Sequence, residues 1–353
     1  MAISADERRE LILRAVRESG TPLRLAELAD RLAIPAVTVR RDVAALAEAG
    51  RVGRSHGFVS FREAPGEPTP ASARTVGLLV PSVGSYFDEL IAGARAAAAA
   101  QGARLVLGIA PYEVRDDRAQ AAQLLENGAD GLLLAPNLLP NGSARDHRWL
   151  DTLPVPAVLV ERGRPDHGTL GDRLDMVYSD HRHGVLLALR HLASLGHERV
   201  LLAARDDSWT ALEVRAGYEQ GMRLLGAQPL PVLSTLDPGA RPADPALLAA
   251  HIATAAANGV RAVLVHNDQD AIQLLPHLRT HGLTVPDDLA LIAYDDVFAA
   301  LAAPPLTAVS PPTRAVGETA VDLLLRRLTT ATPLPVHRTA LLPTLRIRTS
   351  CGG

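Results

Sequence analysis

Residues 262–296 read AVLVHNDQDAIQLLPHLRTHGLTVPDDLALIAYDD, and their pattern indicates the fold of most of the chain. It begins with a short apolar run, Ala262–His266, continues with a helical pattern over 268–281, and returns to an apolar run at Leu289–Tyr294. Short apolar runs separated by helices predict parallel strands that are buried on both faces. The stretch therefore predicts strand–helix–strand units of a doubly wound α/β fold.

The same alternation extends over the chain from residue 75 onward. Further predicted strands are Thr75–Pro81, Arg104–Ile109, Gly131–Ala135, Ala157–Val160, Met176–Ser179 and Arg199–Ala203. A new cycle begins near residue 175, so we predict two similar lobes. The first lobe covers about 75–174 plus 311–334, and the second covers about 175–308 plus 335–350. Ligands of open α/β sheets bind beyond the carboxyl ends of the strands, so functional residues are expected there.

The composition is that of a globular chain with more than one domain, since it has 353 residues, of which 47% are hydrophobic and 21% charged. Residues 62–74 are rich in proline, which predicts a linker between an N-terminal module, 1–61, and a larger part, 75–350. The overall charge of −3 hides a division: residues 1–62 hold 11 Arg and 8 acids, a net of +3, and the remainder holds 25 Arg and 31 acids, a net of −6.

Several function classes are excluded by what the sequence lacks. All 36 basic residues are arginine, which excludes Schiff-base lysines and phosphate-loop lysines. The single cysteine, Cys351, excludes disulfide scaffolds and cysteine-based zinc sites. The first residues are charged and no apolar run approaches the roughly 18 residues of a membrane span, so we expect a cytoplasmic protein without a membrane partner. We expect no metal and no cofactor.

The N-terminal module has the pattern of a winged helix-turn-helix. Apolar residues recur at helical spacing over 7–19, 25–33 and 36–49, and residues 51–61 alternate around a glycine as a short hairpin does. In such a module the second helix of the motif lies in the major groove, where its side chains can read base edges. Double-stranded DNA is therefore the expected partner of this module.

The third helix and the hairpin carry a specific motif. The segment Thr38-Val39-Arg40-Arg41-Asp42-Val43, followed by Arg54-x-His56-Gly57, resembles the DeoR-type helix-turn-helix. The resemblance implies that the helix contacts bases or phosphates and that the wing approaches the DNA backbone. The DNA-binding residues implied in this way are Thr38, Arg40, Arg41, Arg54 and His56. We expect Asp42 to orient arginine side chains or the helix rather than to meet DNA, because phosphates repel a carboxylate.

Polar and aromatic side chains follow the predicted strands of the larger part. A site for a sugar-like ligand needs planar hydrogen-bonding groups that converge on hydroxyls, together with an aromatic face. Side chains of these types occur at the strand ends or in the segments that follow them. The candidate ligand-binding residues are Tyr86, Phe87, Glu161, Arg162, Trp209, Arg215, Asn267 and Asp295.

The order of motifs over 75–350 resembles the sensor of the LacI/GalR family, which is similar to periplasmic sugar-binding proteins. The motifs are Asp180-x-x-x-Gly184, His191-Leu192-x-x-x-Gly196-His197, Arg215-Ala-Gly-Tyr218, Asn267-Asp268, Val285-Pro286-Asp287-Asp288-Leu289 and Tyr294-Asp295-Asp296. The resemblance implies a periplasmic-binding-protein-like fold of two lobes. It also implies that Arg215, Asn267 and Asp295 hold the ligand. Glu161 stands where the family often has Asp, which puts its carboxylate one methylene further out.

Together the two parts predict a ligand-responsive, sequence-specific transcriptional regulator. We expect a repressor of carbohydrate-uptake or catabolic genes that a small sugar-like effector releases or tightens on its operator. A homodimer fits a pseudo-palindromic operator, and the alanine run Ala96–Ala100 offers a surface for a partner helix. The proline-rich linker contains no evident hinge helix, so the switch is expected to rest on rigid-body geometry.

Two alternatives come from other classes. The first is a cytoplasmic sugar or sugar-phosphate enzyme with an attached DNA-binding module, and the second is a binding protein for transport. The sequence lacks a Gly-x-Ser-x-Gly elbow, a Gly-x-Gly-x-x-Gly loop and a phosphate-loop motif, so we expect no catalytic residues and no enzyme activity. Binding of a sugar without its conversion would separate the sensor from the enzyme.

Overall fold

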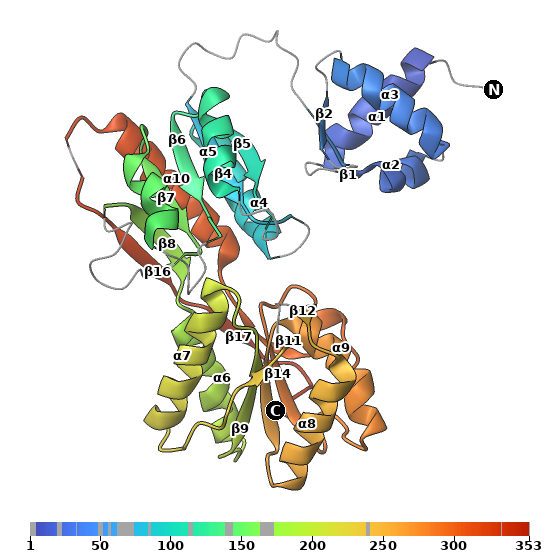
Figure 1. Cartoon of the computed structure of the whole chain (residues 1–353), viewed down its shortest axis with the longest axis vertical. Coiled ribbons are helices and arrows are strands. Elements are labelled where there is room, and N and C mark those ends of the chain that lie inside the picture. The colour runs from blue at the N-terminus through green and yellow to red at the C-terminus, as the bar shows by residue number, and fades with distance from the viewer. Residues whose placement is uncertain are drawn as a thin grey trace. The chain divides into compact units, whose positions relative to one another are not determined.

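The structure is a computed structural model. It describes residues 5–19, 23–32, 34–48, 52–55, 58–61, 74–83, 86–111, 116–137, 144–162, 173–237, 241–332 and 334–352. The chain divides into two compact units, Met1–Ser72 and Ala73–Gly353 (Figure 1). Of the predicted linker over 62–74, all but Arg74 lies outside the described residues.

The N-terminal unit is a winged helix-turn-helix, as the sequence predicts. Three helices pack on an antiparallel sheet of strand order β1-β3-β2. The elements are α1 (Ala5–Ser19), β1 (Leu23–Arg24), α2 (Leu25–Leu32), α3 (Ala36–Glu48), β2 (Val52–Ser55) and β3 (Phe58–Phe61). Their apolar faces form one core, in which Ile12, Val39 and Val43 are fully buried. The short strand β1, which pairs with β3, was not predicted.

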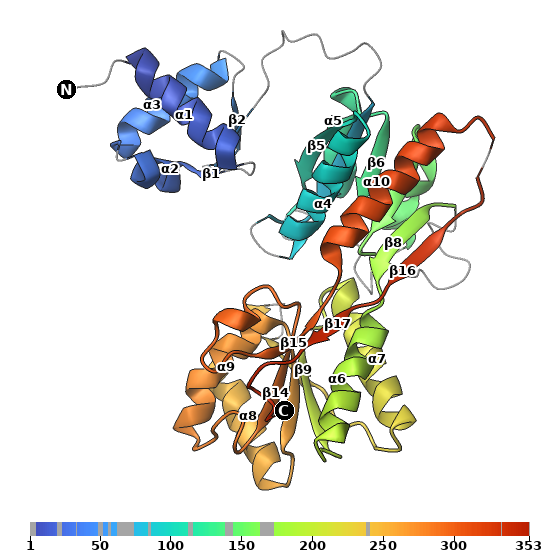
Figure 2. The same ribbon diagram turned by 180° about the vertical axis from the view of Figure 1, so that it is seen from behind.

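The first lobe of the larger unit is built on a parallel sheet of strand order β16-β8-β7-β6-β4-β5. Its elements are β4 (Thr75–Val80), α4 (Phe87–Ala100), β5 (Arg104–Ile109), α5 (Asp117–Glu126), β6 (Gly131–Leu134), η1 (Ala144–Thr152), β7 (Ala157–Val160), β8 (Asp175–Ser179), α10 (Thr313–Thr329) and β16 (Arg338–Leu341). Helices α4 and α10 lie side by side on one face of the sheet (Figure 2), and α5 covers the other face together with η1.

The second lobe repeats this plan with the strand order β10-β9-β13-β14-β15-β17, in which only the edge strand β17 is antiparallel to its neighbour. Its elements are α6 (His181–Ser194), β9 (Val200–Ala204), α7 (Trp209–Leu224), β10 (Leu233–Ser234), α8 (Pro245–Ala257), β13 (Ala262–His266), α9 (Asp268–Thr280), β14 (Ala290–Tyr294), η2 (Ala299–Leu301), β15 (Thr307–Ser310) and β17 (Thr344–Arg346), with a small hairpin of β11 (Leu236–Asp237) and β12 (Arg241–Pro242). Helices α6 and α7 cover one face and α8 and α9 the other, which confirms the doubly wound fold.

The predicted boundary between the lobes is wrong in two places. Strand β8 pairs with β7, and β16 pairs with β8, so residues 175–179 and 338–341 belong to the first lobe and not to the second. Within the described residues the chain passes between the lobes after β8, after β15 and after β16. An apolar strand pattern predicts burial but does not name the neighbouring strand, so these returns of the chain could not be located from periodicity.

The described residues contain neither a candidate membrane span nor a candidate metal site. No helix there is long and apolar enough to span a bilayer. No group of three or more His, Cys, Asp or Glu side chains in that part of the chain could hold a metal ion.

Candidate functional site

The site lies where strands of both lobes end and the chain first passes between them. Glu161 follows β7 of the first lobe and Asp295 follows β14 of the second. Both residues have left-handed backbones, with φ of 50° and 89°. This conformation is uncommon for residues other than glycine and persists only where the surrounding structure holds it. Such positions collect at ligand sites, and here they orient two carboxyl groups at the strand ends.

Glu161 is held by groups from residues 179–182, where the chain passes from β8 of the first lobe to α6 of the second; we call these residues the crossing segment. Its side chain is buried, and its carboxylate accepts hydrogen bonds from the Ser179 hydroxyl (2.7 Å) and backbone N–H (3.2 Å), while His181 Nε2 lies 3.5 Å away. Burial by itself disfavours ionisation, but the interactions with His181 and Ser179 outweigh it, so the pKa of Glu161 is lowered. The carboxylate is therefore an ionised acceptor in the site.

His181 connects Glu161 to the second lobe. Its Nδ1 lies 3.1 Å from the hydroxyl of Tyr294, and that hydroxyl donates to the backbone carbonyl of His181 at 3.2 Å. His266 packs edge-on against the ring of Tyr294, with 5.6 Å between centroids. Burial first, and then the nearby charges of His181, Arg205 and Arg215, lower the pKa of His266 to about 3, so this imidazole is neutral. A buried series of polar contacts thus connects the end of β7 with β14 through His181 of the crossing segment.

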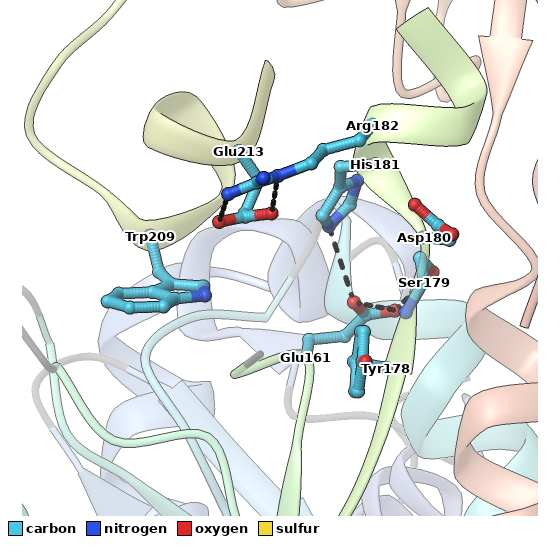
Figure 3. A pocket seen from close by; sticks show the side chains of 8 residues that line it. All are labelled: Glu161, Tyr178, Ser179, Asp180, His181, Arg182, Trp209 and Glu213. Carbon is cyan, nitrogen blue, oxygen red and sulfur yellow. Dashed lines mark hydrogen bonds and ion pairs between the residues drawn. The ribbon is translucent and has the colours of Figure 1, made fainter. Parts of the chain in front are cut away.

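A cavity of about 160 Å³ opens beside these polar contacts (Figure 3). One side is the ring of Trp209, whose Nε1 is buried and has no hydrogen-bond partner among the described residues. Another side is an ion pair in which Arg182 donates twice to Glu213, at 2.7 and 3.1 Å. The residues that line the cavity are Glu161, Tyr178, Ser179, Asp180, His181, Arg182, Trp209 and Glu213.

Asp295, which follows β14, and Tyr86, which directly precedes α4, are two further polar residues near strand ends. Asp295 Oδ1 is buried and has no partner among the described residues. Burial, followed by the charge of Asp268, raises the pKa of Asp295 to about 7. Burial likewise raises the pKa of Tyr86, and the charges of Glu161 and Asp295 add to it. The carboxyl groups of one residue from each lobe thus act on Tyr86.

Other predicted ligand residues are engaged with the framework. Arg215 donates to the carbonyls of Ala204 and Arg205, both at 2.6 Å, and so closes the end of β9. Arg162 is buried, donates to three carbonyls around the ends of β6 and β7, and lies 5.8 Å from the ring centre of Phe87. Phe87 itself is only 4% exposed in the core of the first lobe.

Asn267 caps α9 by accepting from the backbone N–H of Asp270. Of the eight predicted ligand residues, Glu161 and Trp209 line the cavity. Direct ligand contact stays a prediction for all eight.

The residues of the crossing segment were not among the predicted site residues. Ser179, His181 and Arg182 line the cavity, together with Glu213 from α7. Asp180 was noted only as part of a motif, and its side chain caps α6 by accepting from the backbone N–H of His183 at 2.9 Å. The motif Asp180-x-x-x-Gly184 could have drawn attention to this segment, because a capped helix start directly after a strand end places side chains at the site.

The predicted DNA-binding residues of the helix-turn-helix lie on α3 and in the wing. Val39, Val43 and Leu46 are buried, whereas Arg40 and Arg41 are exposed. Thr38 is partly exposed beside them. Of the two wing residues, Arg54 lies in β2 and His56 lies outside the described residues. The DNA contacts of all five residues stay predictions.

Asp42 explains how α3 is oriented. It is 2% exposed and pairs with Arg8 and Arg9 of α1, so it points away from the exposed face of α3. Asp42 thus orients arginine side chains of α1, as the sequence predicts, and that it makes no contact with DNA stays a prediction.

Comparisons with known proteins agree with both units. A model of the DeoR-like helix-turn-helix domain matches residues 8–64, and a model of the periplasmic binding protein-like domain matches residues 189–351. The HTH-type transcriptional repressor PurR of Vibrio parahaemolyticus is 30% identical over 262 residues, which cover 73% of this chain and 75% of that protein. The arabinose metabolism transcriptional repressor of Geobacillus stearothermophilus is 23% identical over 310 residues, with 86% and 83% covered. The solved structure of the transcriptional regulator CelR with cellobiose has a TM-score of 0.65 at 24% identity and covers 89% of this chain and 90% of its own.

A helix-turn-helix unit joined to two lobes that enclose a polar cavity defines a one-chain sensor that binds DNA in response to a ligand. At 30% identity to a repressor of which it covers 75%, the chain belongs to the LacI/GalR family of transcriptional regulators. Its DNA-binding unit is of the DeoR-like type. Both resemblances seen in the sequence are confirmed. The chain is a ligand-responsive DNA-binding repressor, and the findings do not support the alternative of a sugar enzyme.

Proposed function

We propose that the chain represses genes for the uptake or catabolism of a carbohydrate, and that an unphosphorylated monosaccharide in the cavity between the lobes changes its affinity for operator DNA. The protein acts as a homodimer in the cytoplasm, where its DNA partner lies, and it binds the sugar without converting it. Support from relatives is that one regulates arabinose metabolism and that another was solved with cellobiose.

The observation that carries the proposal is the pairing of an aromatic face with hydrogen-bonding groups that lack partners. The ring of Trp209 suits the C–H face of a sugar, and its N–H and Asp295 Oδ1 are buried without partners among the described residues. A sugar hydroxyl both donates and accepts, so it can satisfy each of these groups. The cavity of about 160 Å³ has room for a sugar ring.

Charge argues for a sugar without a phosphate. The nearby arginines are engaged: Arg182 with Glu213, Arg205 with Asp207, and Arg215 with two backbone carbonyls. Glu161 adds a buried carboxylate to the same wall. A phosphate placed there would be desolvated next to carboxylates without a free cation, which is strongly unfavourable.

Isothermal titration of the full chain tests the proposal. The panel consists of arabinose, ribose, glucose and cellobiose, with the phosphate esters of the three monosaccharides, followed by DNA footprinting with each sugar that binds. We expect one neutral monosaccharide to bind and to change the footprint. We expect Trp209→Ala to weaken its binding by at least about tenfold, because the aromatic face is lost.

Leu247→Ala serves as the control, since Leu247 is 61% exposed on α8, and it should leave the affinity unchanged. Tighter binding of a phosphate ester, or turnover of the bound sugar, would show the proposal to be wrong.

A further inference from the structure

The exposed face of α3 has an aliphatic residue near its centre. Successive residues of a helix are about 100° apart, so Val37 lies nearly opposite Leu46 and Val39, which are buried in the core. Val37 is 78% exposed. The ion pairs of Asp42 with α1 fix the rotation of α3 and thereby keep Val37 on the outer face.

The fold gives no reason for valine at this position. An exposed side chain contributes little burial, and valine has a lower helix propensity than alanine. A single exposed aliphatic residue is ordinary on a protein surface, but this one stands three and four residues before the exposed Arg40 and Arg41 and therefore shares their face. It is also in the first turn of α3, and the N-terminal residues of a recognition helix are those that meet base edges.

Base chemistry narrows what Val37 can recognise. In the major groove, base edges present hydrogen-bond donors and acceptors, and the distinctive apolar group among them is the C5-methyl of thymine. Valine can neither donate nor accept a hydrogen bond through its side chain. We propose that Val37 is a specificity-determining residue that selects a thymine in the operator half-site by packing against its C5-methyl group, while Arg40 and Arg41 supply charge on the same helix face.

Removal of the methyl group from the DNA tests this contact. The full-length protein first selects its binding site from a pool of randomised DNA duplexes, and each thymine of the selected site is then replaced in turn by deoxyuridine, which lacks only the C5-methyl. For the natural protein, we expect replacement of one thymine per half-site to weaken binding by roughly fourfold, the effect of losing one buried methyl group. In Val37→Ala that replacement should weaken binding clearly less, because the isopropyl group that packs on the thymine methyl is reduced to a single methyl.

Two further variants make the result decisive. Val37→Ile keeps an apolar side chain, so it should retain the cost of deoxyuridine at the same position. Val336→Ala makes the same chemical change as Val37→Ala at a 44% exposed residue of the larger unit, and it should leave the whole deoxyuridine profile unchanged. Because Val37 is exposed, Val37→Ala should keep its thermal unfolding transition. The proposal is overturned if no thymine replacement weakens DNA binding by the natural protein. It is also overturned if every replacement weakens DNA binding by Val37→Ala as much as it weakens binding by the natural protein.

Discussion

Asp295 is the residue of the candidate ligand site whose negative charge is disfavoured by burial. It has a left-handed backbone directly after β14, and burial and the charge of Asp268 raise the pKa of its carboxyl group to about 7. A carboxyl group with a pKa in this range can donate or accept a hydrogen bond near neutral pH. That versatility suits a sugar hydroxyl, and it means that the empty site carries a destabilising group whenever Asp295 is ionised.

The sign of the pH effect follows from linkage. The pKa of Asp295 in the folded protein lies above the ordinary value of 3.8, so the unfolded chain releases this proton first as the pH rises. The folded state therefore loses stability between about pH 4 and pH 7 and stays at the lower level above pH 7. We predict that Asp295→Asn is more stable than the natural protein at pH 8, by on the order of 4 kcal/mol, and that the difference shrinks towards pH 4.

Urea unfolding at a series of pH values measures this difference. Asp237→Asn is the matched control because Asp237 is an exposed carboxylate at the end of β11, and its effect should be small at every pH. A gain in Asp295→Asn that is the same at pH 4 and pH 8 would remove the titration of Asp295 as its cause.

At the residue scale, the sequence identified the side chains that follow strands and missed those that the crossing segment brings in. Glu161, Trp209 and Asp295 were predicted because parallel strands end at a common edge. His181 and Arg182 were not, because their partners Glu161, Tyr294 and Glu213 are between 20 and 113 residues away along the chain. Periodicity reports which face of an element is buried and contains no information on such distant pairs.

Among the elements, α4 and α10 form the closest-packed pair described in the first lobe. A methyl group on Gly93 would overlap the carbonyl oxygen of Arg314, and one on Gly317 would overlap the carbonyl oxygen of Leu90. Each helix therefore places a glycine where the backbone of the other comes near. One side of the alanine run is used in the same packing, since Ala98 is buried in this core while Ala96 and Ala99 are exposed.

Gly317→Ala should reverse the usual effect of this substitution. In an ordinary helix interior, replacing glycine by alanine stabilises a protein by about 0.5–1 kcal/mol. Here the added methyl meets backbone atoms that cannot turn away, so we predict a loss of about 1–3 kcal/mol in the free energy of unfolding, measured by urea denaturation.

Gly221→Ala in α7 provides the comparison. Its methyl would meet the end of the Leu189 side chain at 2.6 Å, and that side chain can rotate, so a change near zero or a gain is expected. If Gly317→Ala stabilises the protein as much as Gly221→Ala does, the helices are not held together by this close approach.

Element boundaries were largely predictable, and element partners were not. The strands Arg104–Ile109, Ala157–Val160 and Ala262–His266 occur as predicted, because a run of buried apolar residues between helices has few other interpretations. Strands β8 and β16 were assigned to the wrong lobe because each lies next to a crossing, where the chain can continue in either sheet. The edge strand β17 escaped prediction since its three residues are too few to show a period.

For the whole molecule, the division of charge matches the division of tasks. The basic excess lies in residues 1–62 and the acidic excess in the remainder. Since the chain has no lysine, contacts to DNA phosphates fall to arginine, hydroxyl and backbone groups, and arginine can bind a phosphate or guanine in a bidentate way. Linkage relates the two binding equilibria of the protein. If an effector lowers the affinity for operator DNA by some factor, the DNA-bound protein must bind that effector more weakly than the free protein does, by the same factor.

Separation of the two units tests whether the DNA-binding unit depends on the sensor for folding or only for affinity. Residues 1–72 contain a core of their own, with Ile12, Leu28 and Val59 fully buried among residues of the same unit. We predict that a fragment of residues 1–72 folds cooperatively, as followed by circular dichroism. A single unit can occupy only one half-site, so it should bind the selected operator at least about 100-fold more weakly than the full-length protein, for which we propose a homodimer, and no sugar should change that affinity. Fusing the fragment to an unrelated dimeric protein should restore most of the affinity without restoring any response to sugar. A fragment that is unfolded, or that binds as tightly as the full chain, would mean that the sensor does more for the DNA-binding unit than pair it with a second copy.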